Sequence, residues 1–405
     1  MLAPPQPYRR ASIVKSYRTC MKEKRFAQAR QLIADAMQSH PEAAADATLY
    51  RLQMDAIGEL IGSENRKIYL QQQPDTATYF AYISQLFLTG LQCDSVEQTN
   101  LLARQATGKK ATSRLRSTVA ALLMPYRKNL VGAGKWHYRR GEYTQAFHYL
   151  DLYARTKEHP LFTASPPTTV ADPDDLTEVA VLATLSAYAA ECHNGVMRYL
   201  PQALHDTAVE AQLFEVGSKS AAILGDTTEM VRLLEDGFYT HPLHEYFFLT
   251  LTRYYNDLGR YDQALQKAQR MTQLQPLRRD YWYMVGKEQL LMQQQEEALY
   301  SFQQCVEIQA DDAESFAAIG SIHLKQAHDA YAALPTANAT AAYKAQKAAV
   351  NQFYQQARTA YEAARRFAEN QPDLWLSGLR EAYFKLNKGK ELRALEKYLA
   401  SPHDR

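Results

Sequence analysis

Three basic side chains, Lys219, Arg253 and Lys287, follow one another at equal intervals of 34 residues, since 253 − 219 and 287 − 253 are both 34. Lysine and arginine bind anions through charge-assisted hydrogen bonds, so a regular row of them suits a ligand that carries carboxylates. The row can form a surface only if the chain folds so that residues 34 apart lie on the same face of successive elements. The spacing therefore predicts both a binding surface and a structural repeat.

Other residues that could do chemistry do not gather into a site. The sequence holds no GxGxxG, GxxxxGK[ST], HExxH, GxSxG or EF-hand pattern. His137 and His148 flank Gly141 at a spacing that favours packing, and Glu215 and Asp257 are expected to be solvated or salt-paired. We expect no catalytic residue, no metal and no cofactor. The four cysteines lack any CxxC spacing and are expected to be free thiols, mostly buried: Cys20, Cys93, Cys192 and Cys305.

The interval of 34 is the period of an internal repeat. With Glu245 as position 1, apolar, aromatic or small residues occupy positions 4, 7, 11, 15, 17 and 20, and proline occupies position 32: Phe248, Leu251, Tyr255, Gly259, Tyr261, Ala264 and Pro276. The preceding unit, 211–244, keeps this register with Phe214, Gly225, Met230, Leu234 and Pro242. The following unit, 279–312, keeps it with Trp282, Gly286, Ala298, Phe302 and Cys305. A further unit opens at Ala313 with Phe316 and Gly320.

This pattern resembles the tetratricopeptide repeat (TPR), a helix–turn–helix of 34 residues. The resemblance implies an all-α solenoid, a right-handed superhelix of antiparallel helix pairs. Each pair has two apolar faces and needs a neighbour on both sides to bury them. The low content of glycine and proline, 16 residues each, agrees with a helical chain. The array is also similar, more weakly, to bacterial cell-envelope TPR proteins.

The register divides the chain into two segments joined by a proline-rich stretch. Residues 1–160 form an N-terminal segment with degenerate pairs at 10–43 and 127–160, and residues 44–126 are expected to be helices without the TPR pattern. Residues 161–173 are expected to be a connecting loop. Residues 174–405 form a C-terminal array of pairs at 177–210, 211–244, 245–278 and 279–312, an expanded pair at 313–372 and a capping pair at 373–400. The expanded pair carries about two dozen extra residues, so both of its helices should project, joined near Pro335–Asn338.

The family resemblance implies a non-catalytic scaffold or adaptor that binds a protein or peptide along the concave face, which the first helix (helix A) of each pair lines. Positions 2, 5, 9 and 12 form one stripe of that helix. The expected partner is an acidic peptide or one with a free C-terminal carboxylate, although the family's carboxylate clamp is reproduced only in part. The predicted peptide-binding residues are Lys135, Lys219, Tyr246, Arg253, Asn256, Tyr283 and Lys287.

Two alternatives of other classes remain open. The first is an α-helical receptor or enzyme that binds a glycan or another small ligand on the repeat framework, near aromatic residues of 157–172 and 333–345. The second is an anionic-surface binder, because 98–141 contains ten lysines and arginines and no acid. Nucleic acid is the weaker expectation, since no nucleic-acid motif accompanies this stretch. Without a visible signal peptide or an apolar run of about 20 residues, the chain is expected in the cytoplasm, or in the periplasm or cell envelope if an export signal has been removed.

Overall fold

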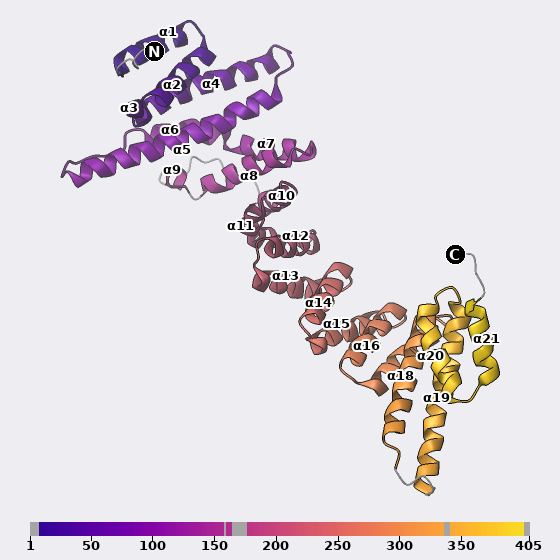
Figure 1. Cartoon of the computed structure of the whole chain (residues 1–405). Helices are drawn as coiled ribbons and strands as arrows, with labels where there is room; N and C mark the ends of the chain where they lie inside the picture. Colours follow the sequence, from indigo (N-terminus) through magenta and orange to yellow (C-terminus); the bar gives the residue numbers. More distant parts are fainter. Residues whose placement is uncertain (1–7, 158, 164–175, 336–340, 401–405) are drawn as a thin grey trace, which may run out of the picture. The chain divides into compact units, whose positions relative to one another are not determined.

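The computed structural model describes residues 8–157, 159–163, 176–335 and 341–400, and every regular element within these ranges is a helix (Figure 1). The chain divides into two compact units, Met1–Leu233 and Leu234–Arg405, and each is described by itself. Both consist of helix pairs whose members pack on each other and on the next pair. The predicted fold class, an all-α solenoid, is confirmed.

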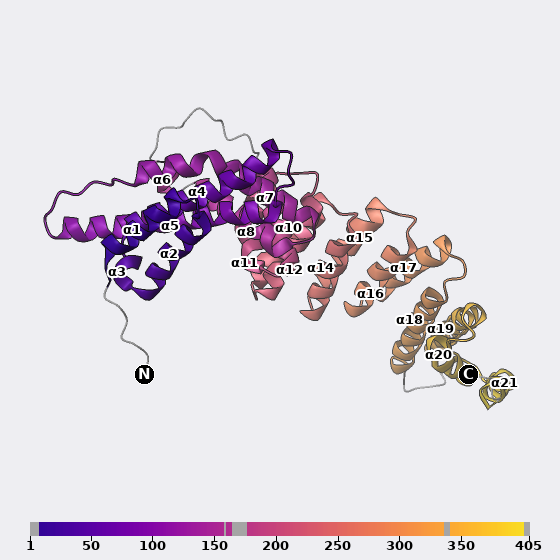
Figure 2. The same cartoon turned by 90° about the horizontal axis from the view of Figure 1, so that it is seen from above.

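The first unit contains three helix pairs of TPR length and, between them, two longer helices. The pairs are α1 with α2, α7 with α8, and α10 with α11, while α4 and α5 lie side by side (Figure 2). Its helices are α1 (Arg10–Lys22), α2 (Phe26–Ser39), α3 (Pro41–Ala44), α4 (Ala47–Tyr69), α5 (Thr76–Ala106), α6 (Arg116–Leu123), the 3-10 turn η1 (Met124–Tyr126), α7 (Arg127–Arg139), α8 (Tyr143–Lys157), α9 (Pro160–Thr163), α10 (Leu176–Ala189), α11 (His193–Ala203) and α12 (Glu210–Ile223).

The second unit continues the same arrangement, because each helix from α14 to α21 packs on the next one along the chain. The division between the units falls inside α13 (Thr227–Thr240). The following helices are α14 (Glu245–Asp257), α15 (Tyr261–Leu274), α16 (Arg279–Leu291), α17 (Gln295–Ile308), α18 (Ala313–Ala332), α19 (Ala341–Phe367), α20 (Pro372–Lys385) and α21 (Gly389–Ala400).

Close packing within a pair explains why position 8 is small. A Cβ atom added to Gly286 would lie 2.8 Å from Cζ of Phe302, the buried side chain at position 24. A Cβ atom on Gly134 would lie 2.5 Å from Cγ of Leu150, which takes the same place in its own pair. The side chain at position 24 of the second helix therefore sits on the bare backbone of the first. A contact this close leaves no room for a larger residue.

One expected core position is filled differently. Trp282, at position 4, is only partly buried, and its indole N–H donates to the Pro276 carbonyl at 2.8 Å. The neighbouring Tyr281 is buried instead and meets the Phe248 ring edge-on at 5.4 Å between centroids. The departure is confined to position 4, because Val285, Gly286 and Gln289 at positions 7, 8 and 11 are buried.

The turn at position 15 keeps one backbone conformation whether or not glycine is present. The residue there has φ between +53° and +78° in seven pairs, although only three of the seven residues are glycine. In each, the following amide donates to the carbonyl five residues earlier, as in Arg25 to Cys20 and Gln294 to Gln289. The seven residues are Lys24, Gly141, Glu191, Gly225, Gly259, Gln293 and Asn387. The closing hydrogen bond therefore holds a conformation that costs a side-chain-bearing residue about 1–2 kcal/mol.

Replacing Glu191 by glycine is expected to stabilise its pair by about 0.5–1 kcal/mol, because relief of the left-handed strain exceeds the added freedom of the unfolded chain. Gly259→Ala should destabilise by about 1 kcal/mol for the opposite reason. Gly132→Ala is the matched control: it lies inside α7 with open space around it, and alanine there should stabilise the helix by about 0.8 kcal/mol. Hydrogen exchange of the flanking helices measures the change in stability for all three variants. If Gly259→Ala and Gly132→Ala change the stability in the same direction, the explanation is wrong.

The two helices of the expanded pair are longer than their neighbours. α18 has 20 residues and α19 has 27, against 13 or 14 in α14 to α17, and both extend beyond the neighbouring helices in Figure 1. Their expected join at Pro335–Asn338 lies mostly outside the described residues. Near the array, Tyr361 of α19 takes the place of the position-24 residue against Gly320. The insertion thus lengthens both helices without disturbing their packed ends.

The proline-rich stretch is not where the compact units divide. Of the expected loop 161–173, residues 161–163 belong to α9, and the remainder lies outside the described residues. α10 packs against α7 and α8 across this stretch, and Tyr199 of α11 donates to Asp151 of α8 at 2.7 Å. The array therefore continues through the expected boundary at 161–173, and the division falls at Leu233–Leu234.

Candidate functional site

The predicted site residues all lie on first helices of pairs. Lys135 is on α7 and Lys219 on α12, both in the first unit. The second unit holds the others: Tyr246, Arg253 and Asn256 on α14, and Tyr283 and Lys287 on α16. We call positions 2, 5, 9 and 12 of these helices the helix-A stripe.

In the first unit, both basic residues of the helix-A stripe have carboxylate partners. Nζ of Lys135 is 2.8 Å from Oε2 of Glu178, and Lys219 pairs with Glu215 one turn earlier on α12. Such half-exposed pairs contribute little to stability, about 0–1 kcal/mol. They do reduce the positive field that the sequence alone predicts, because each cation already has a neighbouring negative charge.

In the second unit, the two basic residues are more exposed. The side chain of Arg253 is 86% exposed, and its nearest carboxylate, Asp257, is 3.9 Å away. Nζ of Lys287 lies 5.9 Å from the ring centroid of Tyr283. Both cations are therefore available to an outside anion at small cost.

The other predicted residues of the second unit are partly built into the fold. Asn256 donates to the buried carboxylate of Glu288 at 2.8 Å, and burial raises the pKa of Glu288 above its usual range. The Tyr283 ring packs edge-on against Phe302 at 5.5 Å, and the Arg279 guanidinium lies 4.4 Å from its centroid. Asn256 and Tyr283 thus join neighbouring helices as well as facing the stripe.

A groove runs across the helix-A stripe of the first unit. It has a volume of 370 Å³, and three tyrosines from three different helices line it, Tyr138 of α7, Tyr143 of α8 and Tyr188 of α10. We call it the tyrosine groove. Lys219 and Glu215 border it. Its remaining lining residues are Leu185, Ala189, Gln212 and Val216.

The tyrosines of this groove combine apolar rings with hydroxyl groups. The rings of Tyr138 and Tyr143 meet edge-on with centroids 5.6 Å apart. The rings of Tyr188 and His193 also meet edge-on, with centroids 6.3 Å apart. Burial raises the pKa of Tyr138, so its hydroxyl stays protonated at neutral pH and can donate. A half-buried tyrosine provides contact area with little loss of side-chain entropy.

Sequence reasoning missed these tyrosines as site residues, although a signal existed. Tyr138 and Tyr188 both occupy position 12 of their pairs (127 + 11 and 177 + 11), one of the four stripe positions. It also missed Arg18, which occupies position 9 of the first pair (10 + 8) and so belongs to the same basic series.

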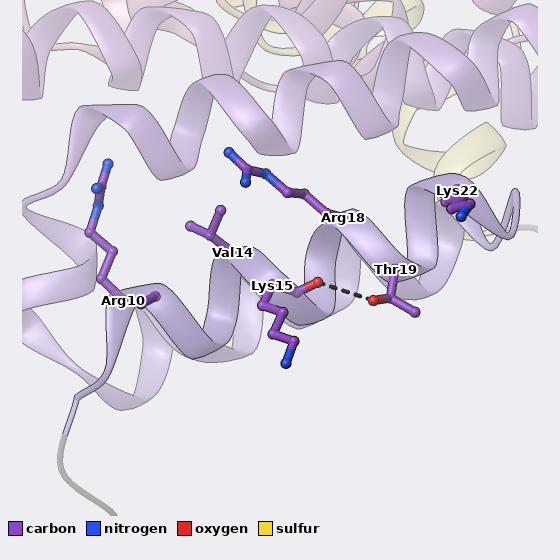
Figure 3. A pocket seen from close by; sticks show the side chains of 7 residues that line it. Arg10, Val14, Lys15, Arg18, Thr19 and Lys22 are labelled. Atoms are coloured by element: carbon purple, nitrogen blue, oxygen red, sulfur yellow. Dashed lines mark hydrogen bonds between the residues drawn. The ribbon is translucent and has the colours of Figure 1, made fainter.

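Arg18 borders a hollow of 610 Å³ along α1, lined by residues of that helix alone. Figure 3 shows Arg10 and Arg18 on one side of α1 with Val14 between them, and Lys15 on the other side. Arg10 is paired with Asp46 at 2.5 Å. Because a single helix forms the whole hollow, it is an open basic surface rather than an enclosed site.

Part of the basic stretch 98–141 is tied into the fold, and the rest of its cations are exposed. Arg116 makes a bidentate pair with the buried Asp94, with both nitrogen–oxygen distances 2.8 Å. The Arg127 guanidinium lies 4.5 Å from the Tyr153 ring centroid, and Arg140 bonds Glu142. The exposed cations that remain are scattered over α5, α7 and the turn after α5: Arg104, Lys109, Lys110, Arg114, Lys128 and Arg139.

Two histidines and two cysteines are held by neighbouring groups or by burial. His137 stacks on Tyr149 and contacts Glu142 at 2.6 Å, and His148 contacts the Ser84 hydroxyl at 2.7 Å. Burial raises the pKa of Cys93 to about 12 and that of Cys305 to about 11, so both stay protonated at neutral pH. In the part of the chain that the structure describes, no group of three or more His, Cys, Asp or Glu side chains could hold a metal ion. Within the same residues, no helix combines the length and the apolar character needed to cross a membrane.

The repeat register, the small residue under position 24 and the recurrent left-handed turn define an all-α helical-repeat fold that resembles the TPR. The solved structures that resemble it include the C-terminal part of a TPR repeat-containing protein from Cytophaga hutchinsonii, at 12% identity over 65% of this chain and 92% of that one, with a TM-score of 0.40. A TPR repeats protein from Bacteroides fragilis shares 12% identity over 64% and 98%, with a TM-score of 0.31. MamA from Desulfovibrio magneticus shares 13% over 46% and 97%, with a TM-score of 0.29.

No family model and no curated protein matches the sequence. At the identities found among solved structures, the likeness concerns the fold alone.

Proposed function

We propose that this chain is a non-catalytic scaffold that binds a peptide segment of another protein in the tyrosine groove. The observation that carries the proposal is the meeting of Tyr138, Tyr143 and Tyr188 from three helices around one hollow of 370 Å³. Consecutive first helices leave this face open, because the second helices and the neighbouring pairs bury the opposite faces. A rigid aromatic surface of this kind provides the central contacts of many protein interfaces.

The size and lining of the groove favour a peptide over a small ligand. Its 370 Å³ accommodates about two or three side chains, at the small end of the range of ligand pockets. The lining supplies hydroxyl, amide and charged groups at its edge through Gln212, Glu215 and Lys219. Such groups can satisfy the backbone of a bound segment while its side chains cover the rings.

The charge of the helix-A stripe supports an acidic peptide, or one that ends in a free carboxylate. Arg253 and Lys287 are exposed cations of the second unit, and Lys135 and Lys219 carry the same charge in the first. An incoming carboxylate competes with Glu178 for Lys135 and with Glu215 for Lys219. We therefore propose that the rings supply most of the affinity and that the cations adjust specificity and association rate.

Tyr138→Ala and Tyr188→Ala are each expected to weaken binding of the partner by about tenfold, because each removes a half-buried ring worth about 1–2 kcal/mol at an interface. The partner is first identified by affinity capture from the native cell, and its binding segment is then titrated against the variants. Tyr69→Ala is the control, since that ring is 87% exposed at the end of α4. The combined change of Lys219, Arg253 and Lys287 to glutamate reverses three charges, and the resulting repulsion of an acidic partner should abolish capture while the helical circular dichroism is retained. Unchanged affinity in both tyrosine variants refutes the groove, and unchanged capture by the triple variant refutes the acidic partner.

A further inference from the structure

We infer that the second unit carries another binding groove, between α13 and α15, which takes an acidic peptide segment in an extended conformation. We call it the α13–α15 groove. It has a volume of 510 Å³ and is formed by second helices of two successive pairs, so no residue of the helix-A stripe lines it. Phe238 and Tyr239 form one wall, and Arg270 with three glutamines forms the other.

Arg270 is the charged centre of the groove. Its guanidinium carbon lies 5.7 Å from the ring centroid of Phe238 and 5.4 Å from that of Tyr239, and it donates to the Tyr239 carbonyl at 3.4 Å. Among the described residues no carboxylate pairs with it. A guanidinium that is stacked on aromatic rings loses less freedom on binding, and its remaining N–H groups form a fork that matches a carboxylate.

The other charges of the groove are already compensated. Lys267 bonds Oε2 of Glu235 at 2.6 Å, while the Tyr255 hydroxyl donates to Oε1 of the same carboxylate at 2.5 Å. Nζ of Lys267 also lies 5.5 Å from the Phe238 ring centroid. The Glu235 carboxylate therefore accepts hydrogen bonds from two donors and does not pair with Arg270. The groove is left with one uncompensated positive charge, which an acidic side chain complements.

Three glutamines give the groove a row of amides that suits a peptide backbone. Gln266, Gln269 and Gln273 line it at intervals of three and four residues, which places them on one face of α15. At about 1.5 Å per residue the row spans about 10 Å, the length of about three residues of an extended chain. Each side-chain amide can donate to a backbone carbonyl and accept from a backbone N–H.

The same features favour a peptide over other anionic partners. One free cation is too few for a nucleic-acid backbone or an anionic membrane, which need clusters of lysine and arginine. The Tyr239 side chain is 72% exposed and Leu274 is 46% exposed, so apolar contact area lies directly beside the cation. An acidic residue followed by an apolar one meets both needs within a single short segment.

The test uses the full chain and a rhodamine-labelled, amidated hexapeptide of alternating glutamate and phenylalanine, followed by fluorescence anisotropy. The wild type should bind this probe, and the matched hexapeptide with glutamine in place of glutamate should bind at least about tenfold more weakly, since the charge-assisted bonds are lost. Arg270→Gln should weaken binding of the glutamate probe by about tenfold, and Arg270→Lys, which keeps the charge but not the fork, by less. Arg260→Gln removes an exposed cation from the same pair outside the groove and should leave the affinity within about twofold.

Three outcomes overturn the proposal. The first is equal affinity of Arg270→Gln and wild type when both give the same helical circular dichroism. The second is equal affinity for the glutamate and glutamine probes. The third is loss of binding in Tyr138→Ala and Tyr188→Ala but not in Arg270→Gln, which assigns the probe to the tyrosine groove. Vesicles of phosphatidylcholine and phosphatidylserine are tested in parallel. If the vesicles bind in an Arg270-dependent manner and the peptide does not bind, the ligand of the groove is an anionic membrane and the peptide proposal is wrong.

Discussion

Replacing Gly378 by alanine is expected to destabilise the second unit by about 3 kcal/mol, because the added methyl group has no room beside Tyr361. A Cβ atom there would lie 2.6 Å from the Tyr361 hydroxyl oxygen and closer still to two ring carbons. The ring cannot retreat, since on its other side it touches Gly320, where a Cβ atom would lie 2.8 Å from Cδ2. Tyr361 is thus held between two glycines, one on α18 and one on α20.

Hydrogen exchange of α18 to α20 in the full chain measures this effect locally, which suits a repeat protein whose unfolding need not be two-state. Gly389→Ala is the matched control, because a Cβ atom there meets nothing within 4 Å. A double-mutant cycle with Tyr361→Leu isolates the cause: with the ring gone, Gly378→Ala should cost less than about 1 kcal/mol. If Gly378→Ala still destabilises by about 3 kcal/mol in the Tyr361→Leu background, the glycine is needed for another reason.

Replacing Asp94 by alanine is expected to destabilise the first unit by about 2–3 kcal/mol, because it leaves the guanidinium of Arg116 without its partner. Asp94 is 4% exposed, and both of its oxygens accept from Arg116, whose pKa this hydrogen bonding raises. The side chain of Arg116 is about a quarter exposed, so water softens the loss. The same stretch of α5 supplies Glu97, which accepts from the backbone N–H groups of Arg114 and Leu115.

Exchange of α5 and α6 amides in Asp94→Ala, compared with wild type, checks this prediction. Asp329→Ala removes an exposed carboxylate that pairs with Lys325 one turn away, and it should change stability by less than about 0.5 kcal/mol. If the two variants differ little, Arg116 is a solvated surface cation and the interpretation of 98–141 as a basic surface regains support.

Much of the fold could be predicted from the chain because the repeat pattern follows from local geometry. A residue at position 24 must pack on position 8, so Gly286 with Phe302 and Gly134 with Leu150 are visible as matched pairs in the sequence. The left-handed turn was harder to see, since Glu191 and Gln293 adopt it without the glycine that usually marks it. Backbone hydrogen bonds enforce that turn, and they leave no trace in residue type.

The candidate sites depended far more on tertiary contacts. The sequence shows ten cations and no acid over 98–141, yet Asp94, before that stretch, and Glu178, after it, approach Arg116 and Lys135 in space. The tyrosine groove needs residues from four helices, and the α13–α15 groove needs the stacking of Arg270 on two rings. Position 12 is shared by Tyr138 and Tyr188, but nothing in the one-dimensional pattern shows that the side chains of either groove meet.

By itself, the sequence determined that this protein is an all-α solenoid of stacked helix pairs, because the spacing of small and large apolar residues admits few other ways of burying them. Only the tertiary structure decided which charges are free and where rings meet, because those properties depend on side chains that come together from different helices. Position along the chain sets the face of a helix on which a residue lies. What that face meets is set by the neighbouring helices.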